Sequence, residues 1–181
     1  MRKSLYKTKY AKKRGDEKLT DYTKAVLYAY PMIKDLESAC EEHIKNKAIL
    51  SYKYLAPCEG LVEYLTEEIA KKEKLMWLEN ILNGAVDKLN DTEKLLLEIR
   101  YFGKKKGKGN VVENSESWSE STYFRMQKRL EKRIENLLKR EGLTQQVFDE
   151  WFAPMQAFQY VHACMQRKKE DFNQAEKRWF T

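Results

Sequence analysis

Residues 117–142 read SWSESTYFRMQKRLEKRIENLLKREG, and this stretch decides the fold. Its apolar side chains recur at steps of three and four residues, the spacing that gathers them on one face of an α-helix. These side chains are Tyr123, Met126, Leu130, Ile134 and Leu137. Ser117 and Glu120 have the spacing of a capping box, and Gly142 is a typical helix stop. The pattern predicts one long helix that packs on a core.

A second set of side chains recurs at the same steps on a different face of this helix. It comprises Ser121, Arg125, Lys128 and Lys132, with Arg129 beside them. A helix that enters the major groove of DNA needs an apolar back, short polar and Arg side chains near its N-terminus, and Lys or Arg further along for phosphates. The same face also fits a basic amphipathic helix that only faces solvent. The stripe therefore makes DNA a candidate ligand and leaves both interpretations open.

The preceding segment, NDTEKLLLEIRYF at 90–102, predicts a second helix over 91–102. Asn90 with Glu93 has the capping-box spacing. An apolar stripe follows, made of Leu95, Leu96, Ile99 and Phe102. Residues 103–117, GKKKGKGNVVENSES, separate the two helices, and their glycines and charges forbid a continuous helix.

This succession resembles the C-terminal helix-turn-helix domain of bacterial RNA polymerase sigma factors, and it is similar to the sigma-like transcription regulators of phages and mobile elements. The resemblance covers residues 88–141. The Leu-rich first helix with its Leu-Arg-Tyr-Phe ending is matched by Glu93, Leu96, Leu97, Ile99, Arg100, Tyr101 and Phe102. The opening of the recognition helix is matched by Ser119 or Ser121, then Thr122, Tyr123, Phe124 and Arg125. The resemblance implies DNA as the ligand and RNA polymerase as a candidate partner.

One departure from the family lies between the two helices. Sigma-like domains carry there a short Glu-Ile-Ala helix that crosses the DNA backbone, and this chain has residues 103–117 instead. Either Val111 and Val112 belong to a shortened version of that helix, or the motif has decayed and DNA binding with it. Lysines in this segment are candidates to replace its phosphate contacts. The expected DNA-binding residues are Lys104, Lys105, Lys106, Lys108, Ser121, Thr122, Arg125, Lys128, Arg129 and Lys132.

The N-terminal half predicts a long helical hairpin over residues 20–89. Apolar residues at helical spacing run from Asp21 to about Lys47, where Pro31 either kinks the helix or starts a second segment. A connector, SYKYLAPCEG at 51–60, is expected before a third helix that begins near Pro57 and ends near residue 89. Residues 1–19 have no sustained apolar period and are expected to form a flexible basic arm.

The C-terminal segment, 143–181, is expected to be helical and carries an unusual load of large apolar side chains. These are Val147, Phe148, Trp151, Phe152, Phe158, Tyr160, Trp179 and Phe180. Such residues rarely stay in water. We expect them to pack within the chain, on the recognition helix, and the alternative is a contact in a homodimer.

Charge is unevenly distributed along the 181 residues, whose total is +7. Residues 1–18 carry +6 and residues 104–141 carry +5, whereas residues 19–103 carry −4. A local basic surface attracts polyanions. A solubilising tail also accounts for the charge of the first segment.

Composition argues against several other classes of protein. None of the seven glycines has the spacing of a phosphate-binding loop, including the three in FGKKKGKGN at 102–110. The three cysteines, Cys40, Cys58 and Cys164, form neither a disulfide framework nor a zinc pattern. Cys40-x-x-His43 and His162-x-Cys164 lie too far apart in the sequence to suggest one metal site. No apolar run approaches the length of a membrane span, and no targeting segment is evident. We expect a cytoplasmic, non-enzymatic protein without a cofactor.

The sequence thus predicts an all-α chain: a basic arm at 1–19, a helical hairpin at 20–89, a sigma-like helix-turn-helix unit at 90–142 and a helical, aromatic-rich segment at 143–181. The leading functional hypothesis is a DNA-binding regulator of transcription. A non-catalytic helical adaptor that binds other proteins is the alternative, and an RNA-binding protein is a third hypothesis.

Overall fold

A computed structural model describes residues 21–54, 58–102 and 118–179, and all regular secondary structure in these ranges is helical. The prediction of an all-α chain is confirmed. The predicted arm at 1–19 lies outside the described residues. The elements in chain order are α1 (Asp21–Ala29), η1 (Tyr30–Met32), α2 (Ile33–Tyr54), α3 (Cys58–Asp87), α4 (Asp91–Tyr101), α6 (Glu120–Arg140), α7 (Gln145–Trp151) and α8 (Gln156–Trp179).

Pro31 interrupts the first helical segment as predicted. It lies in the single 3-10 turn η1, between α1 and α2, where its fixed φ suits the first residues of a helical turn. The backbone amide of Ile33 donates to the carbonyl of Tyr30, which closes the turn. The break therefore separates a short buried helix from a long one.

The predicted connector at 51–60 is largely wrong. Helix α2 runs on to Tyr54 instead of ending near Lys47, and α3 begins at Cys58. Residues 51–54, SYKY, contain neither glycine nor proline, so nothing local stops α2 there. Pro57, which directly precedes α3, is the helix-breaking residue of this stretch.

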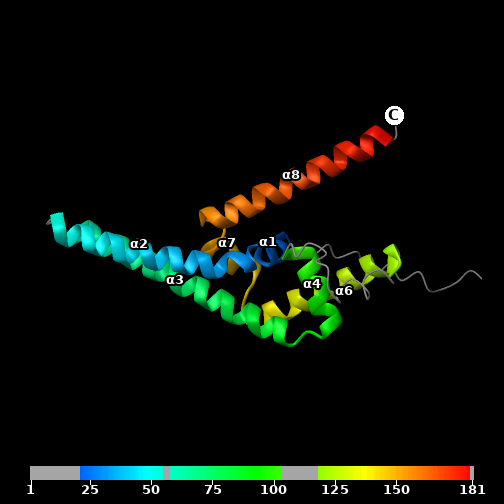
Figure 1. Cartoon of the computed structure of the whole chain (residues 1–181), viewed down its shortest axis with the longest axis horizontal. Coiled ribbons are helices and arrows are strands. Elements are labelled where there is room, and N and C mark those ends of the chain that lie inside the picture. Colours follow the sequence, from blue (N-terminus) through cyan, green and yellow to red (C-terminus); the bar gives the residue numbers. More distant parts are fainter. Residues whose placement is uncertain (1–20, 55–57, 103–117, 180–181) are drawn as a thin grey trace, which may run out of the picture.

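Helices α2 and α3 lie side by side, run in opposite directions and extend well beyond the rest of the molecule (Figure 1). Ion pairs link them along their length: Lys34 lies 3.6 Å from Glu79, and Lys72 lies 3.0 Å from Glu41. At the base of the pair, the Tyr30 hydroxyl donates a 2.5 Å hydrogen bond to Asn83.

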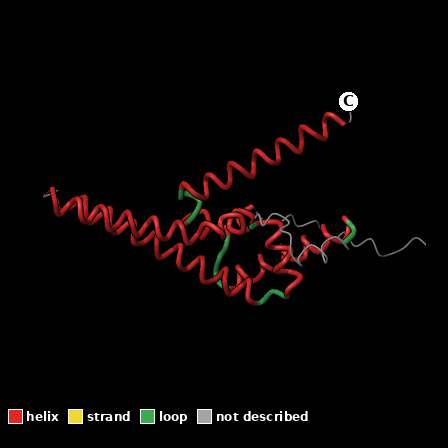
Figure 2. Tube along the Cα trace, in the orientation of Figure 1, coloured by secondary structure: helices red, strands yellow, loops and turns green. Residues whose placement is uncertain are grey.

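The core forms where α1 is enclosed by the C-terminal helices and the base of α3. Val26 and Leu27 of α1 are fully buried, and α1 packs against α8. Figure 2 shows that short loops connect the helices around this region. The N-terminal helix α1 is therefore held in place by the opposite end of the chain.

Phe148, Phe152 and Phe158 of the C-terminal segment pack within the chain, as predicted, and their ring contacts include α1 and α3. The side chains of Trp179 and Phe180 lie outside the described residues. Phe148 lies 5.9 Å from Tyr22 of α1 between ring centroids, and Phe152 stacks on Trp77 of α3 at 6.4 Å. Phe158 is also buried, whereas Tyr160 is exposed. The expected packing partner, the recognition helix, was thus not the main one for these rings.

Helix α6 ends in a hydrogen-bonded cap at Gly142. The Gly142 amide donates to the Lys139 carbonyl at 3.2 Å, and the Leu143 amide donates to the Leu138 carbonyl at 3.0 Å. This is the Schellman arrangement, in which the residue after the helix is left-handed, and Gly142 has φ 94°. The predicted stop at Gly142 is confirmed, and Leu138 and Leu143 are both fully buried beside it.

Candidate nucleic-acid interface

Helix α4 begins with the predicted capping box. The Glu93 amide donates to Asn90 Oδ1 at 2.9 Å, and the Asn90 amide donates to Glu93 Oε2 at 3.0 Å. Two backbone donors that the helix itself leaves without partners are thereby satisfied. The box fixes where α4 starts and holds the Glu93 carboxylate where Arg133 of α6 reaches it.

Helix α6 is capped by Ser119, so the predicted capping box of Ser117 with Glu120 is wrong. Ser119 has an extended backbone, and its hydroxyl accepts a hydrogen bond from the Thr122 amide at 3.4 Å. The cap must stand three residues before the amide that it receives, and Ser119 meets that spacing at the observed helix start. Ser117 lies outside the described residues.

One face of α6 is turned to the core, as the apolar spacing predicts. Leu130 and Ile134 are buried, and Tyr123, Met126 and Leu137 are partly buried against the same core. Helix α6 packs on α3 and α4 through this face. Its orientation about its own axis is therefore set by apolar burial.

A buried polar contact joins α6 to α4. The Tyr101 hydroxyl donates to Glu131 Oε1 at 2.5 Å, and Gln127 Nε2 donates to the same oxygen at 2.8 Å. Burial, and then the charge of Glu131, raise the pKa of the Tyr101 phenol far above its ordinary value of 10.0. The phenol therefore remains a donor at any physiological pH, and it compensates the buried carboxylate.

A second contact fastens α6 at the surface. Arg133 Nη1 donates to both carboxylate oxygens of Glu93, at 2.8 and 2.6 Å, and Nη2 donates to the Lys88 carbonyl at 2.8 Å. Arg133 thus ties α6 to the start of α4 and the end of α3. Sequence reasoning missed this role; the available signal was that Arg133, one residue after Lys132, lies about 100° around the helix from the basic stripe.

The structure places most of the predicted α6 residues on one exposed surface. Five of them are exposed and lie opposite the buried face: Ser121, Arg125, Lys128, Arg129 and Lys132. Thr122 is partly buried, and its hydroxyl lies 2.9 Å from Ser119 Oγ. We call these five exposed residues the basic face of α6.

The remaining predicted residues are not placed. Lys104, Lys105, Lys106 and Lys108 lie outside the described residues, as do Val111 and Val112. Phe124, which is not among the DNA-binding residues expected from the sequence, is 51% exposed next to the basic face, and its ring contacts Tyr123 edge-on at 5.7 Å. Its place beside Arg125 in the sequence is the signal that was available.

The charge that α6 exposes between Ser121 and Lys132 depends on the position of the one carboxylate in this stretch. Between Ser121 and Lys132, Glu131 is the sole acidic residue in the sequence, and it is buried on the side away from the basic face. Within the described residues, Arg125 and Arg129 take part in no ion pair. The positive end of the helix dipole lies at the same end. This surface is therefore suited chemically to anions.

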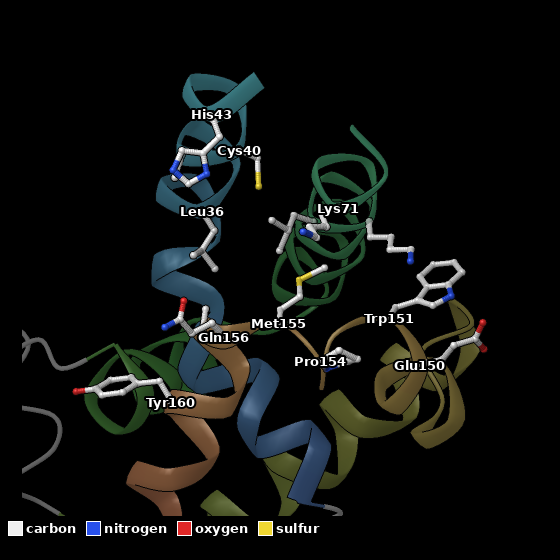
Figure 3. A pocket seen from close by; sticks show the side chains of 14 residues that line it. Leu36, Cys40, His43, Lys71, Glu150, Trp151, Pro154, Met155, Gln156 and Tyr160 are labelled. Atoms are coloured by element: carbon white, nitrogen blue, oxygen red, sulfur yellow. The ribbon is translucent and has the colours of Figure 1, made fainter. Parts of the chain in front are cut away.

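A separate cavity of about 660 Å³ opens between the α2–α3 pair and the turn from α7 to α8 (Figure 3). Its lining includes Leu36 and Cys40 of α2, Lys71 of α3, Trp151 of α7 and Met155 of the turn. In Figure 3 the Glu150 carboxylate points away from the other labelled side chains. The volume lies in the range of small-molecule pockets, and the lining is largely apolar, so the cavity suits an apolar molecule.

The Cys40-x-x-His43 motif faces Glu68 of α3. His43 Nδ1 lies 4.0 Å from Glu68 Oε2, while Glu68 is held at 2.7 Å by Lys71. Burial, and then the Glu68 charge, raise the pKa of the Cys40 thiol, which disfavours the reactive thiolate. No group of three or more His, Cys, Asp or Glu side chains suited to a metal ion occurs in the described ranges.

None of the helices in the described part of the chain is long and apolar enough to cross a membrane. Comparison of the chain with protein-family models, with curated proteins and with solved structures finds no match.

Proposed function

We propose that this protein is a DNA-binding regulator of transcription of the sigma-like type, with α6 as its recognition helix. The observation that carries the proposal is the basic face of α6: Arg125, Lys128, Arg129 and Lys132 are exposed together, and the single carboxylate among them, Glu131, is buried on the other side. A helix used in the major groove needs such a division between an anchored and a charged face.

The support around the basic face is rigid, which sequence-specific recognition requires. Gln127 and Glu131 are locked to Tyr101, and Arg133 is locked to Glu93. A helix held at both its buried and lateral faces loses little entropy when it binds. The arrangement therefore favours DNA recognition by a preformed surface.

In this proposal the residues have different roles. Ser121 and Arg125, near the N-terminus of α6, are assigned to base edges, and Lys128, Arg129 and Lys132 to phosphates. RNA polymerase is the proposed protein partner, as the resemblance to sigma factors implies, and phages or mobile elements are the proposed source. A homodimer on a two-fold symmetric DNA site is compatible with the same surface.

A titration of a fluorescent random-sequence DNA duplex with the full chain tests the proposal. We expect binding that weakens steeply between low and moderate salt, because counterions are released from the phosphates. Single-stranded RNA is the competitor that distinguishes the RNA-binding hypothesis. Absence of duplex binding at low salt contradicts the proposal and favours the non-catalytic adaptor, and stronger competition by RNA than by duplex DNA also contradicts it.

A further inference from the structure

The cavity between the α2–α3 pair and the turn from α7 to α8 has three walls (Figure 3). Ala39 and Cys40 follow Leu36 by three and four residues, so these three lining residues lie on one face of α2. The lining residues of α3 are related by the same steps. The third wall includes Trp151 of α7 and Met155 of the following turn. Two of the three walls are therefore faces of regular helices.

The buried part of this lining is apolar. Leu75 of α3 is buried, and Leu36 and Met155 are partly buried against the core. Each CH₂ group of a ligand that moves from water onto such side chains favours binding. The volume of about 660 Å³ lies in the range of pockets that enclose small molecules. A ligand of this cavity therefore has a hydrocarbon body.

The carboxylates near the cavity are neutralised or directed elsewhere. Glu68 is buried beside Cys40, and Lys71 holds its carboxylate at 2.7 Å. Glu150 is exposed, and its carboxylate points away from the other labelled side chains in Figure 3. Neither carboxylate is thus available to pair with a cationic ligand.

Lys74 supplies a positive charge to the cavity. Its Nζ lies 5.5 Å from the centre of the Trp151 ring, and both side chains belong to the lining. Lys74 is partly buried, and within the described ranges it forms no ion pair with a carboxylate. An ammonium over an aromatic ring stays charged and keeps N–H donors for an anion. The ring face that would attract a cationic ligand is already used by Lys74.

We propose that this cavity binds an amphipathic carboxylate, a molecule with a hydrocarbon body and a single carboxylate group. The body lies against Leu36, Leu75 and Met155, and the carboxylate accepts a hydrogen bond from Lys74. An uncharged apolar molecule gains nothing from Lys74, and a cationic one is repelled by it. The basic segment 1–18 of the chain, with its charge of +6, has the same sign as Lys74 and is not a complementary occupant.

The cavity is separate from the proposed DNA surface. Its lining includes no residue of α6. Ligand binding in the cavity and duplex binding by α6 are therefore measured independently, and failure of one proposal leaves the other intact.

Three probes with the same chain length test the charge preference. At pH 7 octanoate is an anion, octanol is neutral and octylamine is a cation. Isothermal titration of the full chain measures the three affinities. We expect octanoate to bind about tenfold more tightly than octanol, because only octanoate pairs with a partly buried ammonium, and octylamine to bind most weakly. Equal affinity of octanoate and octanol, tighter binding of octylamine, or no binding of octanoate overturns the proposal.

A shorter acid tests the contribution of the hydrocarbon body. Butanoate has the same carboxylate as octanoate and four fewer CH₂ groups. We expect butanoate to bind at least about tenfold more weakly, since each CH₂ group adds to the transfer free energy. Equal affinity of the two acids would indicate pairing with a surface cation alone and would contradict binding in the cavity.

The Cys40 thiol reports where octanoate binds. Cys40 lines the cavity, whereas Cys164 of α8 does not, and both are free and partly buried. Alkylation by N-ethylmaleimide is followed by mass spectrometry of the peptides that contain each cysteine. We expect octanoate to slow alkylation of Cys40 severalfold and to leave the rate at Cys164 unchanged. An unchanged rate at Cys40, or equal slowing at both, contradicts the assigned site.

Point variants separate the charge from the cavity. Lys74→Gln is expected to weaken octanoate about tenfold and to leave octanol unchanged. The matched control is Lys47→Gln, which removes another lysine that lies over an aromatic ring, 5.4 Å from the centre of Tyr64 and outside the cavity. Ala39→Phe fills the cavity and is expected to abolish binding of both probes. Unchanged melting curves without ligand establish that each variant is folded. The proposal is wrong if Lys47→Gln weakens octanoate as much as Lys74→Gln does, or if folded Ala39→Phe binds octanoate like the wild type.

Discussion

The Tyr101 phenol of α4 donates a 2.5 Å hydrogen bond to the buried carboxylate of Glu131 on α6. This hydrogen bond holds the negative charge of Glu131 in the interior, away from the exposed side of α6. It also fixes the rotation of α6 about its own axis. The basic face of α6 therefore depends on a residue that itself faces the core.

Tyr101→Phe removes this donor and leaves the Glu131 carboxylate with Gln127 as its remaining donor in the described structure. We expect the free energy of unfolding at neutral pH to fall by about 1–3 kcal/mol, the usual cost of an uncompensated buried polar group. Urea unfolding followed by circular dichroism measures the change. A variant as stable as the wild type would show that the hydrogen bond from Tyr101 does not stabilise the fold.

The same contact predicts a decline of stability in alkali. Because the pKa of Tyr101 is raised above 10.0 by burial, the unfolded chain releases the phenolic proton near pH 10 while the folded chain keeps it. Its stabilising effect is present below pH 10 and is lost as the pH rises above that value. Other tyrosines add to the decline, so the test compares slopes, and the slope should be smaller in Tyr101→Phe.

Two glycines are expected to respond to alanine with opposite signs. Gly142→Ala forces an L-residue to φ 94° at the end of α6 and is expected to cost about 1–2 kcal/mol. Gly84→Ala, inside α3, adds a methyl group with no atom within 4 Å and is expected to stabilise the protein by about 0.5–1 kcal/mol. Thermal melts of the two variants check this pair, and a shared sign contradicts the assigned backbone geometry.

Two arginines one turn apart on α6, Arg129 and Arg133, are expected to differ in role: one contributes to DNA binding and the other to stability. Arg133→Met breaks the contacts to Glu93 and Lys88 and is expected to lower the unfolding free energy by up to about 1 kcal/mol, since the pair is only half-buried. Arg129→Met is expected to leave stability unchanged and to weaken binding of duplex DNA. A reversal of these two results would exchange the roles assigned to the two side chains.

Arg125 and Lys132 are expected to differ in specificity. A duplex selected by the wild-type protein from a randomised pool serves as the specific site. Arg125→Ala is expected to weaken binding to it by about 1–3 kcal/mol while random duplex is affected less, whereas Lys132→Ala weakens both alike. Equal losses on the two duplexes at Arg125 would contradict its assignment to base edges.

Local chemistry made several elements predictable from the sequence. The helix predicted over 91–102 is α4, Asp91–Tyr101, because Asn90 and Glu93 form their cap within four residues of chain. The apolar stripe of α6 was correctly placed for the same reason, since periodicity depends only on neighbouring turns. The end of α2 was misplaced, because residues 48–54 contain no glycine or proline that would mark a stop in the sequence.

Long-range contacts could not be predicted in this way. Nothing near Glu131 indicates that Tyr101 will bury it, and nothing near Phe152 indicates that it will stack on Trp77 of α3. At the start of α6, Ser117 and Ser119 both fit a cap locally, and the structure selects Ser119. The exposed half of the candidate site was therefore accessible from the sequence, and the contacts that orient it were not.

The most direct test of the account is the salt dependence of duplex binding for a variant of the basic face, Arg125→Gln with Lys128→Gln, Arg129→Gln and Lys132→Gln. The matched control replaces four exposed lysines elsewhere: Lys34, Lys45, Lys47 and Lys88. We predict that the slope of log affinity against log salt is shallower by about 3 to 4 in the first variant and nearly unchanged in the control. An unchanged slope in the first variant, or an equal loss in both, would contradict DNA binding by α6.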